Sequence, residues 1–364
     1  MTQLVQGLKK TAIAAAILSF SAVASATIVT SIKPLGFIAS AIANGVTDVD
    51  VLVPTGASPH DYNLKPSDAQ KLKSAEMVVW IGEDVDLFLD KSIDDLDYKK
   101  VLTIKDIAAI EPFLMKGEYH HHHGEGDAHE HGHEGHHHAH EEHDHKHVHG
   151  DHDYKHEHEH EHAEHDHKHD HAHAEHKHDH VHEAHEHHHD DDASINWHVW
   201  YSPDISKVVA QRIAAKLVKQ YPEKKALIEK NVAEFDRTLA ETSVKIKAQL
   251  ESVKDKGFYV FHDAYGYFNQ AYGLNQTGYF TINPLVAPGA KTLAKIKEEI
   301  GEHKVSCLFA EPQFTPKVIE SLSKATQVKV GRLDPMGDSV KAEDNPYAAF
   351  LQFTADSYSQ CLAK

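Results

Sequence analysis

The chain has 364 residues, a formal net charge of −19 and two cysteines. Its excess charge is local, because residues 118–192 hold 23 acidic residues and four lysines while the remainder has 33 acidic and 33 basic residues. The length allows about two domains, and the balanced remainder offers no basic face, which excludes nucleic acid as a partner.

The N-terminus has the pattern of a secretory signal peptide. Lys9 and Lys10 precede an apolar run over 11–23, and Ala-Ser-Ala at 24–26 is a small-residue cleavage site. A membrane anchor is the alternative, but the run is shorter than a membrane span requires. Residues 1–26 are therefore predicted to be removed. Since no cysteine at the cleavage site offers a lipidation point, we expect a diffusing protein of the periplasm.

The next block alternates strand and helix patterns. It is assigned to residues 27–117 and is expected to resume over 193–221 as an N-terminal lobe. Its apolar, β-branched runs predict four strands, and a proline-led polar segment predicts a helix over 65–74. The predicted strands cover 28–32, 49–53, 77–81 and 101–104.

A second block, residues 257–364, repeats this alternation and is expected to form a C-terminal lobe. Alternating strands and helices predict an α/β fold with two lobes of mainly parallel sheet. The predicted strands cover 258–261, 279–282, 305–310 and 328–333, and the predicted helices cover 293–302, 317–325 and 347–362.

Residues 222–256 are predicted to form one long rigid helix that joins the lobes. Pro222 suits a first helical turn, and no glycine or proline follows until Gly257. Apolar residues recur along it at spacings of three, four and seven. A helix of about 30 residues is about 45 Å long. Such a connector is expected to limit hinge bending between the lobes.

Residues 118–192 are a low-complexity tract that holds 33 of the 37 histidines. The tract has too few large apolar residues to offset its chain entropy, so it is predicted to be disordered. Imidazole is a preferred ligand of zinc, copper and nickel, which favours metal binding over a simple spacer. Two roles remain open: a collector that feeds zinc to a tighter site, and a brake that acts in zinc excess.

Four histidines lie outside the tract: His60, His198, His262 and His303. The first three follow strands or precede a helix, where open α/β sheets bind ligands. Taken singly, each is more often a structural or solvated residue. His303 is expected to lie at a helix C-terminus, where a partial positive charge is favoured.

The two cysteines, Cys307 and Cys361, suggest one disulfide in an oxidising compartment. Such a bridge would attach the C-terminal helix to the sheet. Two buried free thiols are the alternative. No C-x-x-C spacing is present, so a thiolate zinc site or a redox motif is not expected.

Five segments carry a resemblance to a known family. The chain resembles the metal-binding receptors of ABC transporters, and within them the zinc-receptor branch, across nearly the whole mature length. That branch carries a histidine-rich insertion, a long connecting helix and a C-terminal disulfide in the same places. The segments are Gly56–Asp68, Asn196–Pro203, Phe261–Phe268, Phe309–Phe314 and Leu333–Gly337.

The resemblance implies that His60, His198 and His262 bind Zn²⁺ as the transported ligand. Manganese-specific relatives carry a carboxylate at the position of His262, whereas three neutral imidazoles suit zinc. Zinc binding is expected to weaken as the pH falls through the ordinary histidine pKa near ~6.5. Asp334 matches a residue that coordinates metal in some members, and Pro59 stands where some zinc receptors have glutamate. A water molecule or a tract side chain could also complete the site.

Two further carboxylates, Asp263 and Glu311, are candidates for orienting the imidazole N–H groups. The alternative for both is an ordinary surface or capping role.

The function implied is a monomeric periplasmic receptor, not an enzyme, that captures Zn²⁺ and delivers it to an importer. Its partners would be the membrane permease and, through it, the ATPase of a zinc ABC importer. Two other classes are weighed against it. A zinc hydrolase would require a general base beside the metal, and no H-E-x-x-H or G-x-S-x-G motif occurs. A zinc storage protein or metallochaperone would use the tract as its working part, but would not explain three histidines in a two-lobed body.

Overall fold

The computed structural model describes residues 27–116, 195–314, 317–341 and 345–363. The predicted signal peptide and the histidine-rich tract lie outside these ranges. The described ranges belong to one compact unit. Among the described residues, no helix is long and apolar enough to cross a membrane.

The first sheet has four parallel strands in the order β2-β1-β3-β4. The strand β3 is buried along its whole length, as expected for a parallel strand covered on both faces. The strands are β1 (Thr27–Thr30), β2 (Asp48–Val51), β3 (Met77–Trp80) and β4 (Val101–Thr103). The helices of this part are α1 (Lys33–Ala43), α2 (Pro66–Ser74), α3 (Glu83–Asp86), α4 (Asp90–Asp94) and α5 (Pro203–Gln220).

The second sheet repeats this topology in the order β6-β5-β7-β8, again all parallel. The predicted α/β class and all eight predicted strands are confirmed. The strands are β5 (Phe258–His262), β6 (Gln276–Thr281), β7 (Cys307–Ala310) and β8 (Lys329–Arg332). The helices are α7 (Gly266–Tyr272), α8 (Ala290–Glu302), α9 (Lys317–Thr326) and α10 (Pro346–Leu362).

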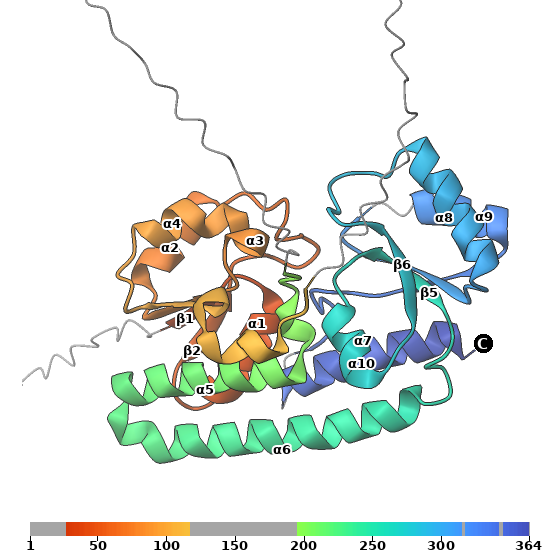
Figure 1. The fold of residues 1–364 in the computed structure, drawn as a ribbon. Coiled ribbons are helices and arrows are strands. Elements are labelled where there is room, and N and C mark those ends of the chain that lie inside the picture. Colours follow the sequence, from red (N-terminus) through yellow and green to blue (C-terminus); the bar gives the residue numbers. More distant parts are fainter. Residues whose placement is uncertain (1–26, 117–194, 315–316, 342–344, 364) are drawn as a thin grey trace, which may run out of the picture. The chain divides into compact units, whose positions relative to one another are not determined.

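The long helix α6 spans Lys225–Leu250, 26 residues, and is shorter than the predicted 222–256. Residues Pro222–Lys224 form a 3-10 turn instead, and residues 251–255 form turns in which only Val253 is buried. Without a continuing apolar face, no further helical turn is held there. The helix packs against α1 and α5 of the first half and against α7 and α10 of the second (Figure 1).

A continuous apolar core also joins the two halves. Tyr201, in the 3-10 turn before α5, stacks on Phe350 of α10 with ring centroids 5.1 Å apart. The Tyr347 hydroxyl donates to the Trp200 carbonyl at 2.8 Å, and the Trp200 indole donates to the Pro335 carbonyl at 3.0 Å. The two sheets are thus joined by packing as well as by α6, and a small hinge motion stays a prediction.

A disulfide joins Cys307, the first residue of β7, to Cys361 near the end of α10. The Cα atoms are 6.1 Å apart, within the usual range for a bridge. The bridge ties the C-terminal helix to the second sheet, as the predicted disulfide requires, and the alternative of two free thiols is wrong.

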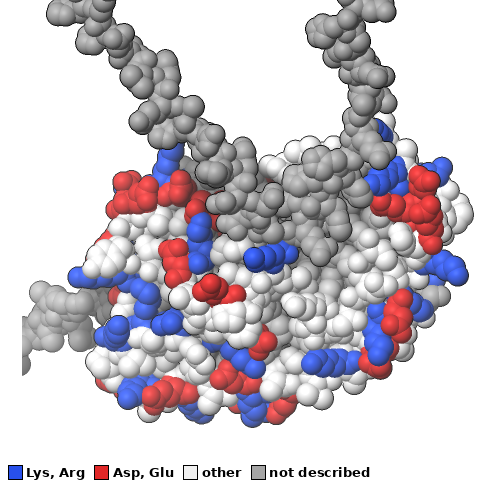
Figure 2. Space-filling view, in the orientation of Figure 1, with Lys and Arg blue, Asp and Glu red and all other residues white. Residues whose placement is uncertain are grey.

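On the face shown in Figure 2, basic and acidic side chains are interspersed. No basic patch extends across this face.

Candidate metal centre

Parallel-sheet topology places His262 at a ligand-binding edge. The order of the second sheet reverses between β5 and β7, and the carboxyl ends of strands at such a switch point line a crevice. His262 is the last residue of β5, and Glu311 follows directly on β7. Both side chains are buried there.

The other two histidines come from loops of the first half. His60 lies in the loop between β2 and α2, where Gly56 adopts φ +83°, a conformation that favours glycine. His198 lies directly before the 3-10 turn Val199–Tyr201 that leads into α5. The position of α5 is fixed locally, because the Ser202 side chain accepts from the Ile205 backbone N–H at its first turn.

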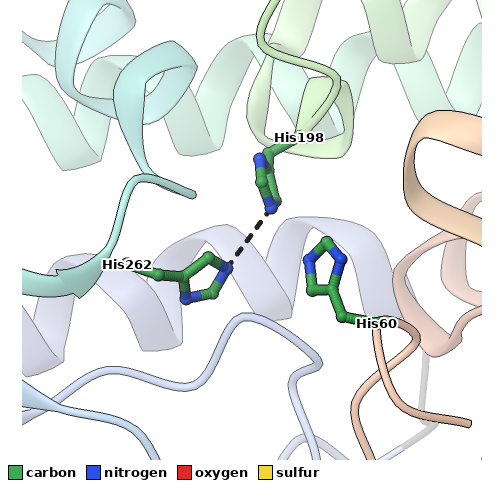
Figure 3. A group of neighbouring side chains, drawn as sticks. All are labelled: His60, His198 and His262. Carbon is green, nitrogen blue, oxygen red and sulfur yellow. Dashed lines mark hydrogen bonds between the residues drawn. The ribbon is translucent and has the colours of Figure 1, made fainter. Parts of the chain in front are cut away.

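The three imidazoles converge on one point (Figure 3). One ligand nitrogen from each of His60, His198 and His262 can be chosen so that all lie within 4.8 Å of one another. The Nε2 atoms of His198 and His262 are 3.3 Å apart. Two nitrogens that bind one tetrahedral zinc at about 2.0–2.1 Å lie about 3.3–3.4 Å apart. This pair therefore has the spacing of two zinc ligands.

Hydrogen bonds at the outer nitrogens set the tautomers of two rings. His262 Nδ1 lies 2.8 Å from both oxygens of Glu311, so it donates to the carboxylate. His198 Nδ1 lies 2.8 Å from Asn196 Oδ1. Asn196 Nδ2 donates to the Asp263 backbone carbonyl at 2.9 Å and to its carboxylate at 3.3 Å, which fixes Oδ1 as the acceptor for His198. When both rings are neutral, their Nε2 atoms therefore carry lone pairs that face each other as metal ligands do.

The two carboxylates singled out in the sequence have different roles. Glu311 contacts a histidine ring directly, while Asp263 acts one bond further away, through Asn196. Asn196 itself was missed in the sequence. Its position two residues before His198 was the available signal, because Asn side chains accept from backbone N–H groups two residues on, as here from His198 at 3.0 Å.

Burial keeps two of the imidazoles neutral. The pKa of His60 is lowered from 6.5 to about 4, first by burial and then by charge repulsion from His262. The pKa of His198 is lowered well below 6.5 by burial and then by the charges of His262 and His60. The sequence-based expectation that proton competition begins near ~6.5 is therefore corrected for these two residues, because burial disfavours the charged imidazolium.

A pH titration of zinc affinity should show this correction. Protonated imidazole cannot bind metal, so affinity falls with pH only where a ligand is protonated. His60 and His198 are already neutral near pH 6.5, so these two candidate ligands should add almost nothing to the pH dependence of log Kd between about pH 6.5 and 5. Competition titrations with a chelator of known pH dependence would measure this slope. A change in log Kd of two or more units per pH unit would mean that His60 or His198 takes up a proton in this range.

Asp334 lies outside the group of converging ligand atoms. Its carboxylate accepts hydrogen bonds from Gln313 Nε2 at 2.9 Å and from the backbone N–H groups of Met336 and Asp338 at 3.2 and 2.6 Å. It thereby shapes a turn that needs Gly337 at φ +63°. His303 is exposed at the C-terminal cap of α8, as the sequence predicts.

The contact between Glu311 and His262 gives a second prediction. Replacing Glu311 by glutamine keeps an acceptor for Nδ1 but removes the negative charge that increases the basicity of the ring. Losses at such supporting residues are typically about 10–100-fold, and we expect Glu311→Gln to weaken zinc binding about tenfold. Glu320→Gln, an exposed position on α9, is the matched control. Equal affinity in both variants would show that the carboxylate does not support the ligand.

The fold and the site together define a class of protein: the α/β solute-binding proteins that hold a metal ion. The features that define it here are two parallel four-stranded sheets, a long helix packed against both halves, and three converging histidines. The family model of zinc-uptake complex component A, periplasmic, matches residues 28–361, and the chain belongs to this family. It is therefore a periplasmic component of a zinc-uptake system and not an enzyme.

Curated relatives agree with this assignment, and solved structures share the fold. The chain is 68% identical to the high-affinity zinc uptake system protein ZnuA of Haemophilus influenzae, covering 98% of this chain and 99% of that protein. It is 38% identical to the ZnuA protein of Yersinia pestis, covering 93% and 92%. Its fold is similar to a zinc-bound ZnuA deletion mutant (TM-score 0.63, 20% identity, 93% and 98% covered). It is also similar to the periplasmic zinc-binding protein TroA of Treponema pallidum (TM-score 0.66, 16% identity, 93% and 100% covered).

Proposed function

We propose that His60, His198 and His262 bind one Zn²⁺ as cargo, and that the loaded protein delivers it to the membrane permease of a zinc ABC importer. The ATPase acts through that permease. The observation that carries the ligand assignment is the 3.3 Å separation of two Nε2 lone pairs, each held in place by an outer hydrogen bond. Two lone pairs at this distance repel each other when no cation lies between them. A cation removes this repulsion because both nitrogens can bind it.

The chemistry of the site favours zinc over manganese. Three neutral imidazoles are ligands of zinc, copper and nickel, whereas manganese prefers carboxylate, carbonyl and water oxygens. Among the described residues, Glu311 is the only carboxylate with a hydrogen bond to one of the three imidazoles, and its oxygens are directed at Nδ1 of His262. It therefore supports a nitrogen ligand, and the ligands that the protein supplies include no carboxylate oxygen.

All three ligands come from one chain, so we propose that the protein works as a monomer. They come from both halves: His60 and His198 from the first and His262 from the second. We assign these halves to lobes over 27–117 with 193–221 and over 257–364, with 222–256 as the connector. Zinc bound between the two lobes would hold them together, and a permease could recognise the surface that the two lobes then share.

Zinc uptake by cells tests the transport role. Zinc-starved cells that lack their own copy of this gene should import radioactive zinc when they secrete the wild-type chain. The His198→Ala variant, secreted at the same level, should restore little uptake because it cannot load. Full uptake with His198→Ala would contradict the proposal.

A further inference from the structure

Gln313 lies between β7 and α9 and lines the same cavity as the three histidines. Its amide nitrogen, Nε2, donates to Asp334 Oδ1 at 2.9 Å and to Asp338 Oδ2 at 3.1 Å. A carboxylate in its ionised form only accepts hydrogen bonds. The orientation of the amide is therefore fixed, with nitrogen toward the two carboxylates and oxygen away from them.

This orientation is held from both halves of the molecule. Asp338 Oδ2 also accepts from the Gly56 backbone N–H at 2.8 Å, in the loop that carries His60. The Asp338 backbone N–H in turn donates to Asp334. Gln313 thus belongs to a network that reaches the first metal-binding loop, and it cannot exchange its nitrogen and oxygen without breaking two charge-assisted hydrogen bonds.

The amide oxygen of Gln313 has no partner among the residues that the structure describes, although it is buried. A buried acceptor without a donor is costly, by more than the gain from a typical hydrogen bond. Its side chain lines a cavity where three imidazoles leave a tetrahedral zinc one ligand short. A water molecule in that fourth position has two O–H donors, and the metal strengthens both.

We infer that Gln313 Oε1 accepts a hydrogen bond from the water that completes the coordination of the bound zinc, and that Asp334 anchors Gln313 and does not bind the metal. This inference rests on the proposed zinc site. It explains why a carboxylate so close to the cavity has its oxygens directed at Gln313, Met336 and Asp338.

Anions such as azide test the Gln313 acceptor, because they can replace the water at the metal. Azide has no proton to donate, so replacing the water by azide would place lone pairs against Gln313 Oε1. The wild-type site should therefore bind azide weakly. Gln313→Met retains a side chain of similar length but removes the acceptor, and it should remove this discrimination.

The test uses Co²⁺, whose visible absorption reports the coordination of a site with zinc-like ligands. The full mature chain is given half an equivalent of metal, so that only the tightest site fills, and is then titrated with azide. Gln313→Met should bind azide at least about tenfold more tightly than wild type, and zinc about three- to tenfold more weakly, as loss of one hydrogen bond predicts.

Gln352 on α10 provides a matched control. Its Nε2 donates to Gln249 and Asp356, and its Oε1 is also buried without a partner among the described residues, but it does not line the cavity. Gln352→Met should change neither azide nor zinc affinity. Asp334→Asn should weaken zinc binding by no more than Gln313→Met does. Loss of a true ligand would weaken zinc binding by at least about a hundredfold.

An azide affinity of Gln313→Met equal to that of the wild type would overturn the inference. A collapse of zinc binding in Asp334→Asn with retained folding would overturn the anchoring role. If the wild-type chain holds no tight Co²⁺ or Zn²⁺ at all, the proposed function fails, and that result is distinct from both of these.

Discussion

Alanine at His60, His198 or His262 should weaken zinc binding at the tight site by at least about a hundredfold. Loss of a residue that only supports a ligand lowers metal affinity by about 10–100-fold, and loss of one of the three proposed ligands would remove a metal bond outright. The effect should be similar at all three positions, because each supplies one nitrogen to the same group. Chelator competition on a chain without residues 118–192 measures it without the tract's own histidines.

The control for this series is His303→Ala. His303 is exposed at the end of α8 and should leave zinc affinity unchanged. Thermal unfolding of each metal-free variant checks that the fold persists. Wild-type affinity in any one of the three site variants would remove that residue from the ligand set.

Removing the disulfide should have the largest effect on stability. Cys307 and Cys361 are 54 residues apart, and in the chain-entropy treatment a loop of that size stabilises by about 4 kcal/mol. Replacing both residues by alanine, which leaves no polar group in the buried position of Cys307, should lower the melting temperature by about 8–16 °C for a domain of this size. The metal-free chain is the one to measure, because bound zinc adds its own stabilisation.

Reduction of the wild-type disulfide should reproduce this shift, and the same reductant should leave the double alanine variant unchanged. If the free energy of unfolding falls by less than about 1 kcal/mol, the packing of α10 alone holds the C-terminus, because the entropic gain from the bridge would then be absent.

Much of this fold could be predicted because its central strands, β1, β3, β5 and β7, are short and largely buried. Met77–Trp80 has the continuous hydrophobic pattern of a covered parallel strand, and it is one. The start of β6 was predicted three residues late, because Gln276, Thr277 and Gly278 carry no such pattern. Gly278 is needed there, since a side chain at that position would collide with the ring of Tyr259. That is a tertiary requirement and leaves no local signal.

The site also contains residues that the sequence indicates and residues that only the three-dimensional structure reveals. His60, His198 and His262 could be selected because so few histidines lie outside the tract and because each follows a strand or precedes a helix. The roles of Asn196 and Gln313 depend on which loops meet in three dimensions. Asn196 is fixed by Asp263, 67 residues away, and Gln313 is fixed by Asp338, which also holds the loop of His60. The spacing of residues along the chain does not show such contacts.

The most direct measurement is the number of tightly bound zinc ions on a chain from which residues 118–192 have been removed. The residues that flank this segment lie together. Lys116 pairs with Ile195, and the Asn196 backbone N–H donates to the Met115 carbonyl. A short linker can therefore replace the segment. We predict one tight zinc per chain, with an affinity close to that of the full chain and abolished when His60, His198 and His262 are all replaced by alanine. Loss of nearly all tight binding on removal of the tract would contradict the account, because the tract would then be the zinc-binding part of the protein.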